Sequence, residues 1–278
     1  MQIVDAVKHA QQQLVKSDSA RLDAEVLLCS ILKCERTHLY TYPEQNLSGR
    51  EINSFNELIA LRTKGHPIAH LLQKKEFWSL NLKVTTETLI PRPETEILVE
   101  AALNLIPKES SFSILELGTG TGAISIAIAT DRHLANITAT DIKGSALQVA
   151  KANAKSHQLN NITFEKANWF DIDNINTYDL IISNPPYISI NDPHLRQGDV
   201  RFEPESALVS GKEGLDDLHI IIAGAKKYLH SNGWLLLEHG CQQGKAIRQL
   251  LEENNFSTIS TLKDYSNLDR VSIGQWLS

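Results

Sequence analysis

Cysteine is scarce in this sequence, and the few cysteines present do not form a recognisable site. The three of them, Cys29, Cys34 and Cys241, lack CxxC spacing and have no cluster of histidines beside them. An odd number of cysteines with this spacing indicates neither a disulfide framework nor a zinc site. We therefore expect free thiols and no metal.

Long apolar runs and an excess of positive charge are also missing. No stretch approaches the ~18 apolar residues of a membrane-spanning helix, and residues 1–16 do not resemble a signal peptide. Lys and Arg number 27 against 33 Asp and Glu, so the net charge of −6 lacks the basic footprint of a dedicated nucleic-acid-binding protein. These absences predict a cytoplasmic protein with no membrane partner and no stable nucleic-acid partner, and we expect a monomer.

The apolar residues that are present, 42% of 278, suffice to bury one large core or two smaller ones. Residues 2–65 show helical spacing, and Ser48 with Glu51 forms a capping-box pattern that predicts the start of a helix. The periodicity then changes, because residues 77–84 alternate like a strand or a hairpin. We predict three parts: an N-terminal helical domain at 1–72, a β-hairpin linker at 73–92 and a larger domain at 93–278.

The larger domain alternates apolar strand runs with helical stretches. This alternation is typical of a parallel sheet with helices on both faces. The predicted strands are 113–118, 136–141, 162–167, 178–183, 233–239, 256–263 and 270–276, and the helices between them are 122–131, 144–157, 214–230 and 242–254. The fold class is therefore α/β, with a seven-stranded, mostly parallel, Rossmann-like sheet.

A glycine-rich loop follows the first of these strands. Gly118, Gly120 and Gly122 open a helix, so backbone N–H groups can approach a ligand closely. Asp141 ends the next strand near the ~20-residue offset expected of a ribose-binding carboxylate. The pattern indicates a nucleotide-type site but does not separate NAD from S-adenosylmethionine. Glu116 lies in the strand below the loop and either orients a ligand amine or the loop amides, or is a buried structural carboxylate.

A second motif, Asn184-Pro185-Pro186-Tyr187, ends the strand at 178–183. Two prolines fix φ and remove two N–H donors, which leaves carbonyl groups that only accept hydrogen bonds. The Asn184 side-chain oxygen and the Pro185 carbonyl are suited to accept both protons of a planar –NH2 group, while Tyr187 stacks on it. The motif predicts a site that aligns the nitrogen of an amide or a base for attack, without a general base.

Together the two motifs resemble the HemK/PrmC family, the bacterial methyltransferases of peptide chain release factors. Further segments extend the resemblance over essentially the whole chain: Pro91-Arg-Pro-Glu-Thr-Glu96, Arg201-Phe-Glu-Pro204 and Leu235-Leu-Leu-Glu-His-Gly240. The resemblance implies a methyltransferase sheet and S-adenosylmethionine as the methyl donor. It implies that the acceptor is the side-chain amide nitrogen of the glutamine in the Gly-Gly-Gln loop of release factors one and two.

The resemblance also assigns roles to residues. Asp141 would hold the ribose of the cofactor, Trp169 would lie against its adenine, and Asn168 replaces a residue that is often acidic in the family. Asn184, Pro185 and Tyr187 would be catalytic, and Asn184 would also touch the cofactor. The methionine part of the cofactor would lie on Gly118, Thr119, Gly120, Thr121 and Gly122. The glutamine would lie on Asn184, Pro185, Pro186 and Tyr187.

Other charged groups have two interpretations each. Arg92, Glu94 and Glu96 either shape the floor of the acceptor site or form an Arg–Glu pair that fixes the hairpin between the domains. Glu203 either contacts the peptide or is a solvated loop carboxylate. His239 follows an apolar strand, and we expect a core histidine rather than a catalyst.

Three alternative functions remain to be weighed. An amino-methyltransferase of adenine or cytosine would use the same Asn-Pro-Pro-Tyr motif, but it would have to flip a base and grip phosphates. Residues 1–75 carry a charge of +2 and the remainder −8, which disfavours that function. An NAD-dependent oxidoreductase would leave the Asn-Pro-Pro-Tyr motif unexplained. A pure binding module is disfavoured because each expected catalytic position is filled.

Overall fold

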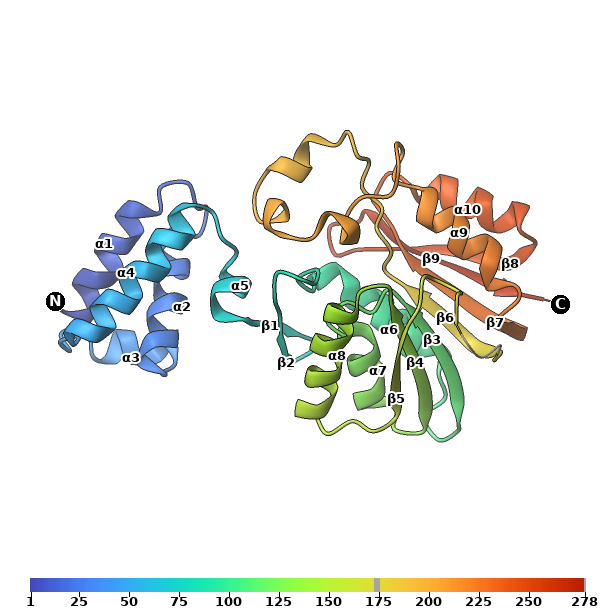
Figure 1. Ribbon diagram of the computed structural model, residues 1–278, viewed down its shortest axis with the longest axis horizontal. Helices are drawn as coiled ribbons and strands as arrows, with labels where there is room; N and C mark the ends of the chain where they lie inside the picture. Colours follow the sequence, from blue (N-terminus) through green and yellow to red (C-terminus); the bar gives the residue numbers. More distant parts are fainter. Residues whose placement is uncertain (173–175, 278) are drawn as a thin grey trace. The chain divides into compact units, whose positions relative to one another are not determined.

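The computed structural model describes residues 1–172 and 176–277 and divides into two compact units (Figure 1). Unit 1 comprises Met1–Lys74 together with Arg196–Phe202. Unit 2 comprises Lys75–Leu195 and Glu203–Ser278.

Unit 1 is built from short helices packed around an apolar core. The helices are α1 (Ile3–Gln13), α2 (Ala20–Leu32), α3 (Arg36–Thr41), α4 (Gly49–Thr63) and α5 (Ile68–Leu72). Ile3, Leu27 and Phe55 are at most 1% exposed and bring α1, α2 and α4 together. The predicted capping box opens α4: Glu51 N donates to Ser48 Oγ at 3.3 Å, and Ser48 N donates to a Glu51 carboxylate oxygen at 2.7 Å. The predicted N-terminal helical region is confirmed.

Residues 196–202 belong to unit 1 although they are distant in sequence from its helices. Arg62 Nη1 lies 3.3 Å from Asp199 Oδ1, and the Phe202 ring lies 4.4 Å from the His66 ring. An ion pair and a ring contact therefore attach this loop segment to the end of α4 and the turn that follows it.

A two-stranded hairpin follows unit 1, formed by β1 (Lys74–Phe77) and β2 (Leu80–Lys83). Its turn residues Trp78 and Ser79 have φ of +53° and +58°, the left-handed values that tight two-residue hairpins require. Trp78 N donates to Glu96 Oε1 at 2.8 Å. Glu96 therefore holds the hairpin through a backbone N–H group, whereas the Arg–Glu pair expected to fix the hairpin is not formed by Arg92, which pairs with Glu203.

Unit 2 is an α/β domain with a seven-stranded sheet in the order β5-β4-β3-β6-β7-β9-β8. The strands are β3 (Phe112–Leu117), β4 (Ala135–Asp141), β5 (Ile162–Lys166), β6 (Tyr178–Ser183), β7 (Leu229–Glu238), β8 (Phe256–Lys263) and β9 (Asp269–Trp276). All neighbouring pairs are parallel except those that β9 makes with β7 and β8. The predicted seven-stranded, mostly parallel sheet is confirmed.

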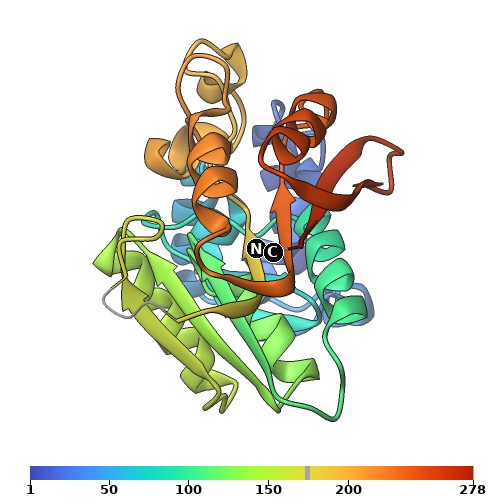
Figure 2. The ribbon, with the colours of Figure 1, turned by 90° about the vertical axis from the view of Figure 1, so that its right-hand side faces the viewer.

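Helices cover both faces of this sheet (Figures 1 and 2). They are α6 (Glu96–Leu105), α7 (Ala123–Asp131), α8 (Gly144–Ser156), α9 (Asp216–Ala225) and α10 (Gly244–Glu253), and a 3₁₀ turn (Pro93–Thr95) precedes α6. Ile114 of β3 packs in one core with residues of α6, α7 and α8, whereas its neighbour Leu115 packs in a second core with residues of α9 and α10. The alternation of side chains along the strand produces the two layers.

The boundaries of α9 and β7 differ from the prediction. The predicted helix 214–230 ends at Ala225, and β7 begins at Leu229 rather than at 233. Leu229 pairs with Tyr178 of β6, and the register shifts after that pair. The intervening residues of β7 are polar and exposed, so a pattern of apolar side chains does not reveal that they belong to a strand.

Asn153 of α8 ties the hairpin to the glycine loop. Its side-chain oxygen accepts from Lys83 N at 2.7 Å, and its Nδ2 donates to the carbonyls of Lys83 and Thr121 at 3.0 and 2.9 Å. Asn153 is 2% exposed, so removal of its amide leaves buried polar groups without partners.

We expect Asn153→Ala to lower the free energy of unfolding by about 2–3 kcal/mol, measured by urea denaturation. Asn136→Ala removes an exposed amide that donates to Ser111 Oγ, and it should change stability by no more than about 0.5 kcal/mol. Equal stability changes in the two variants would contradict a tethering role for Asn153.

Candidate active site

The glycine loop connects the end of β3 to α7 and adopts a backbone that favours glycine. Gly118, Gly120 and Gly122 have φ of +73°, +55° and +83°. A Cβ on Gly122 would lie 2.9 Å from Ile126 Cδ1 and 3.2 Å from Ala150 Cβ. The loop can therefore turn into α7 only with a residue that lacks a side chain at this position.

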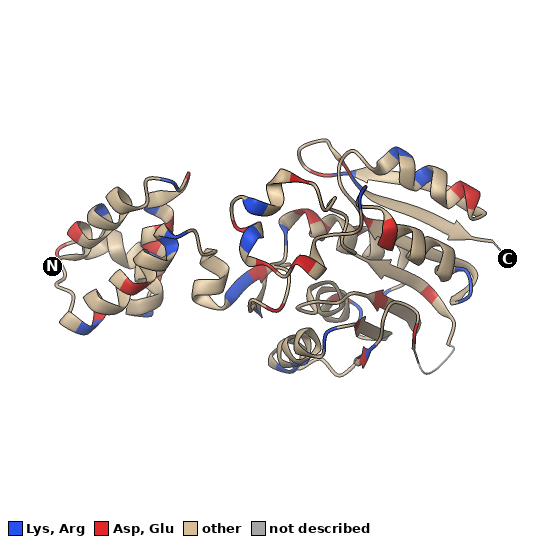
Figure 3. Ribbon diagram, turned by 45° about the horizontal axis from the view of Figure 1, so that its top comes forward, with Lys and Arg blue, Asp and Glu red and all other residues tan. Residues whose placement is uncertain are grey.

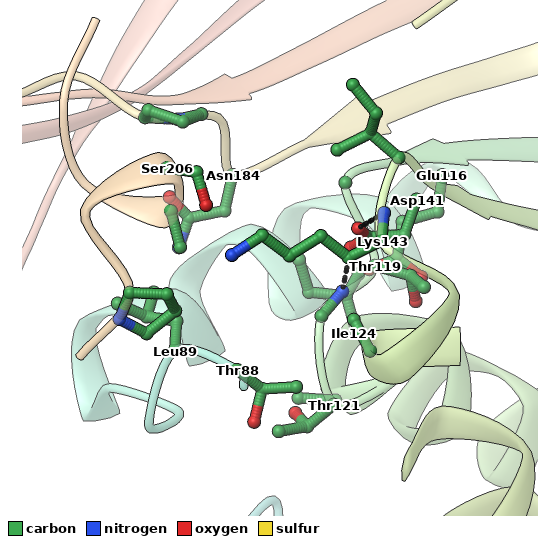
Figure 4. A pocket seen from close by; sticks show the side chains of 18 of the residues that line it. Thr88, Leu89, Glu116, Thr119, Thr121, Ile124, Asp141, Lys143, Asn184 and Ser206 are labelled. Atoms are coloured by element: carbon green, nitrogen blue, oxygen red, sulfur yellow. Dashed lines mark hydrogen bonds between the residues drawn. The ribbon is translucent and has the colours of Figure 1, made fainter. Parts of the chain in front are cut away.

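Asp141 stabilises this loop from the end of β4. Its Oδ2 accepts from Gly120 N at 2.9 Å, and its Oδ1 accepts from Lys143 N at 2.8 Å (Figure 4). Because β3 and β4 are parallel neighbours, their carboxyl ends meet at one edge of the sheet. The carboxylate is thus fixed beside the loop and retains lone pairs for a ligand.

A cavity of about 250 Å³ opens at this edge of the sheet. Of the predicted site residues, Gly118, Thr119, Gly120, Thr121, Asp141, Trp169, Asn184 and Pro186 line it. Gly122, Pro185 and Tyr187 do not line it. Segments distant in sequence complete the wall with Thr88, Leu89, Lys143, Ser206 and Asp217, four of which are labelled in Figure 4.

Glu116 is a buried carboxyl group at the floor of this cavity, only 1% exposed. One of its oxygens, Oε2, accepts from the hydroxyls of Thr119, at 2.7 Å, and Ser125. No described residue pairs with the other oxygen, Oε1. Burial raises the pKa of Glu116 to about 7, so a cation placed against Oε1 would stabilise the ionised form.

Trp169 forms another part of the wall. Its Nε1 donates to Asp217 Oδ1, in the first turn of α9, at 3.1 Å. A Cβ on Gly118 would lie 3.5 Å from the Trp169 ring, so the ring lies against the glycine loop. Asn168, the residue that departs from the family pattern, also lines the cavity.

The Asn-Pro-Pro-Tyr segment lies after β6, next to the glycine loop. Asn184 Nδ2 donates to Thr95 Oγ1 at 3.1 Å, and the Tyr187 hydroxyl donates to Glu238 Oε1 at 3.3 Å. The Tyr187 carbonyl accepts from Gln243 Nε2 at 3.1 Å. Both ends of the motif are therefore held by side chains from other elements.

The sequence interpretation singled out none of these holding residues for this role. Thr95 is part of the segment 91–96, which resembles the family as a whole and does not set Thr95 apart. Glu238 stands out in its strand only because a carboxylate follows three leucines. Gly214 is a further contact, because a Cβ there would lie 2.2 Å from the Tyr187 carbonyl oxygen. Asp216 and Asp217 form an acidic first turn of α9, a pattern that marks a helix N-terminus and could have drawn attention to Asp217.

The sequence assigns Arg92 and Glu203 to different roles, but they form an ion pair in which Arg92 Nη2 lies 2.5 Å from Glu203 Oε1. The Glu203 side chain is fully buried, so it is not a solvated loop carboxylate.

His239 is also fully buried: its Nδ1 donates to the Gly240 carbonyl at 2.9 Å, and its Nε2 accepts from Ser272 Oγ at 2.8 Å. Burial lowers the pKa of His239, and this environment is that of a neutral core histidine.

The three cysteines are free thiols. Within residues 1–172 and 176–277, no group of three or more His, Cys, Asp and Glu is arranged to hold a metal ion. Among the helices of the same residues, none combines the length and the hydropathy of a membrane span.

Two solved methyltransferases share the fold of this chain. A methyltransferase from Pyrococcus furiosus matches 80% of this chain and 98% of its own, with a TM-score of 0.55 and 17% identity. A 16S rRNA N2 G1207 methyltransferase from T. thermophilus, solved with AdoMet and guanosine, matches 73% of this chain and 49% of its own, with a TM-score of 0.52 and 17% identity. These likenesses establish the fold.

Sequence comparisons establish the family. The family described as "Methyltransferase domain" matches residues 108–272, and "PrmC N-terminal domain" matches residues 5–72. The release factor glutamine methyltransferase of Aliivibrio fischeri is 47% identical over 94% of this chain and 92% of its own length. That of Shewanella oneidensis is 46% identical over 99% and 96%. The chain therefore belongs to the release factor glutamine methyltransferase family, the family that its motifs resemble.

Proposed function

We propose that this chain transfers a methyl group from S-adenosylmethionine to the side-chain amide nitrogen of the glutamine in the Gly-Gly-Gln motif of release factors one and two. The observation that carries the proposal is the position of Asn184 and Pro186 in the wall of the cavity that the glycine loop and Asp141 also form. Relatives named release factor glutamine methyltransferase, similar over almost the full chain, support the acceptor.

The residues of the cavity fit the cofactor. The unpartnered Oε1 of buried Glu116 is suited to an ammonium group, and the remaining lone pairs of Asp141 are suited to ribose hydroxyls. We assign the adenine to the Trp169 side of the cavity and the methionine part to Gly118–Gly122. When bound, S-adenosylmethionine supplies an electrophilic methyl group on a positively charged sulfur.

We assign the acceptor to two oxygen atoms that accept hydrogen bonds. The Asn184 side-chain oxygen and the Pro185 carbonyl would take the two N–H bonds of the glutamine amide, so that the nitrogen lone pair faces the methyl group. Tyr187 would stack on the planar amide. Held in this way, the amide nitrogen would form the new N–C bond as the S–C bond of bound S-adenosylmethionine breaks with its electron pair left on sulfur, and the nitrogen would then lose one proton to water.

The N-terminal helical domain, 1–72, is proposed to select the release factor, while the hairpin linker at 73–92 joins it to the methyltransferase domain at 93–278. This division rests on the charge of +2 for residues 1–75 against −8 for the rest. If it holds, the full chain should have a much higher kcat/KM for an intact release factor than for a short Gly-Gly-Gln peptide.

Deletion of residues 1–70 tests the same division. In a remainder that circular dichroism shows to be folded, kcat/KM for the intact release factor should fall at least tenfold, while that for the peptide should change little. Unchanged catalytic efficiency toward the intact release factor would show that residues 1–70 do not select it.

The reaction itself is tested with the purified chain and S-adenosylmethionine labelled in the methyl group. Release factor, duplex DNA and single-stranded nucleic acid are offered in parallel. Label should appear on the Gly-Gly-Gln glutamine, located by peptide mass spectrometry. Both basic and acidic residues are distributed along the ribbon of unit 2 (Figure 3). If the label appeared on nucleic acid alone, the proposed acceptor would be wrong, but S-adenosylmethionine would still be the methyl donor.

A further inference from the structure

Gln243, the residue immediately before α10, has a side chain that the proposed chemistry does not use. It does not line the cofactor cavity. Its side-chain amide nevertheless makes hydrogen bonds to segments up to 56 positions away in the sequence. An amide on the surface would bond to water instead, so these partners indicate what the side chain does.

The amide of Gln243 joins three segments of unit 2. Its oxygen, Oε1, accepts from Gly240 N, just after β7, at 2.8 Å. Its Nε2 donates to the carbonyl of Tyr187, at the end of the Asn-Pro-Pro-Tyr motif, at 3.1 Å. The same nitrogen donates to the carbonyl of Gly214, in the loop before α9, at 3.1 Å, and lies 3.5 Å from the carbonyl of Glu213. One side chain therefore connects the motif to two other elements.

These partners fix the direction in which the amide faces. A backbone N–H group only donates, and a carbonyl oxygen only accepts. Gly240 N can therefore bond only to the Gln243 oxygen, and the carbonyls can bond only to its NH2 group. The NH2 group has one proton for each of the two nearer carbonyls. A carboxylate of the same shape would keep the contact with Gly240 N and lose both of the others.

Two glycines give the amide room to reach Tyr187. Gly214 has φ of +74°, and a Cβ there would overlap the Tyr187 carbonyl oxygen and lie 3.0 Å from Gln243 Nε2. A Cβ on Gly240 would lie 3.1 Å from Gln243 Oε1 and 3.7 Å from Tyr187 Cδ2. Both glycines thus lie against the backbone or the ring edge of Tyr187 as well as against Gln243.

Tyr187 is held at two points. Its hydroxyl donates to Glu238 Oε1 at 3.3 Å, and its carbonyl accepts from Gln243. The two residues before it, Pro185 and Pro186, have no N–H group that could anchor this stretch of backbone. The contact with Gln243 therefore fixes the backbone from which the Tyr187 ring projects.

We propose that Gln243 is a positioning residue, which holds the backbone of Tyr187 so that the ring stacks on the acceptor amide. This inference rests on the proposed role of Tyr187 in holding the glutamine. Neither Gln243 nor its partners Gly214 and Gly240 line the cofactor cavity. Loss of the Gln243 amide should therefore impair methyl transfer and leave cofactor binding unchanged.

The test is Gln243→Glu in the full chain, with intact release factor and saturating S-adenosylmethionine at pH 8. Glutamate has nearly the shape of glutamine but no NH2 group, and it turns a carboxylate oxygen toward two carbonyl oxygens. We expect kcat to fall at least tenfold, while the dissociation constant of S-adenosylhomocysteine changes less than threefold. The value of kcat is expressed per molecule that binds S-adenosylhomocysteine, counted by calorimetry, so a loss of folded protein does not lower it.

Gln242→Glu is the matched control, because it adds the same charge at an exposed neighbouring residue. It should keep kcat within twofold of wild type. Gln243→Ala is the second variant if Gln243→Glu does not fold, and it should lower kcat at least fivefold by the same measure. Wild-type kcat in the variant that folds would overturn the inference, as would an equal loss in Gln242→Glu.

A double variant tests whether Gln243 acts through Tyr187. Tyr187→Ala alone should lower kcat at least tenfold. If Gln243 serves to place the Tyr187 ring, adding Gln243→Glu to Tyr187→Ala should lower kcat less than threefold further. If the two losses multiply instead, Gln243 acts independently of Tyr187 and the inference is overturned.

The same variants separate this inference from the proposed function. Failure of the proposed function would appear in the wild-type chain, as an absence of label on the release factor. Wild-type turnover in Tyr187→Ala would overturn the stacking role of Tyr187, and this inference with it. Impaired turnover in Tyr187→Ala together with wild-type kcat in Gln243→Glu would overturn only the positioning role of Gln243.

Discussion

Asn184→Ala is expected to lower kcat about 100-fold while changing the dissociation constant of S-adenosylhomocysteine less than threefold. The alanine keeps the backbone that leads into Pro185 and Pro186 but removes the side-chain oxygen that would accept an amide proton. The acceptor nitrogen would then be held by the Pro185 carbonyl alone, and misplacement by about 1 Å can cost a factor of 10². Steady-state methylation of release factor and calorimetric titration measure the two quantities.

Asn191→Ala is a matched control, because Asn191 is an exposed asparagine in the loop that follows the same motif. It should leave both kcat and cofactor binding near wild-type values. An equal loss of turnover and of cofactor affinity in Asn184→Ala would instead show that Asn184 serves mainly the cofactor.

The parts of the site that depend on local pattern could be predicted from the sequence. Gly118, Gly120 and Gly122 are spaced as a strand-to-helix turn requires, and Asp141 ends the neighbouring strand. Parallel strands bring their carboxyl ends to one edge of the sheet, so the residues that end two neighbouring strands lie close together although they are about 20 positions apart in the sequence. The same reasoning located Asn184 at the end of β6.

The supporting residues could not be predicted, because each joins segments that are far apart in the sequence. Thr95 meets Asn184 across 89 positions, and Tyr187 meets Glu238 across 51. A single buried hydroxyl or carboxyl group leaves no periodicity, so neither hydropathy nor spacing signals such a contact. These two contacts hold the two ends of the motif.

A similar limit applies to the loop at 188–213, which carries no periodic pattern. Residues 196–202 within it belong to unit 1 through contacts such as Arg62 with Asp199, whereas the next residue, Glu203, pairs with Arg92 in unit 2. Ion pairs between distant segments determine these attachments. The sequence shows the charges but not their pairing.

Asp141→Ala should weaken cofactor binding about 100-fold, an effect of roughly 3 kcal/mol. Asp141 would accept from the ribose hydroxyls, and it already accepts from Gly120 N at 2.9 Å. Hydrogen bonds to a charged group contribute about 1.5–3 kcal/mol each, so loss of the ribose contacts and loosening of the loop together account for the size of the effect. Calorimetry with S-adenosylhomocysteine measures it, and kcat at saturating cofactor should fall less than fivefold.

Asp131→Ala controls for the loss of a carboxylate elsewhere, since the Asp131 side chain accepts from Trp78 Nε1 and does not line the cavity. Its cofactor affinity should stay within twofold of wild type.

Asp141→Asn tests whether the negative charge of Asp141 is needed, because asparagine has nearly the same shape but no charge. The asparagine has one acceptor oxygen, so its NH2 group must face either Gly120 N or Lys143 N, both of which donate to the aspartate. We therefore expect Asp141→Asn to bind the cofactor no better than Asp141→Ala does, whereas near-wild-type affinity would mean that the ribose is held by other residues of the cavity.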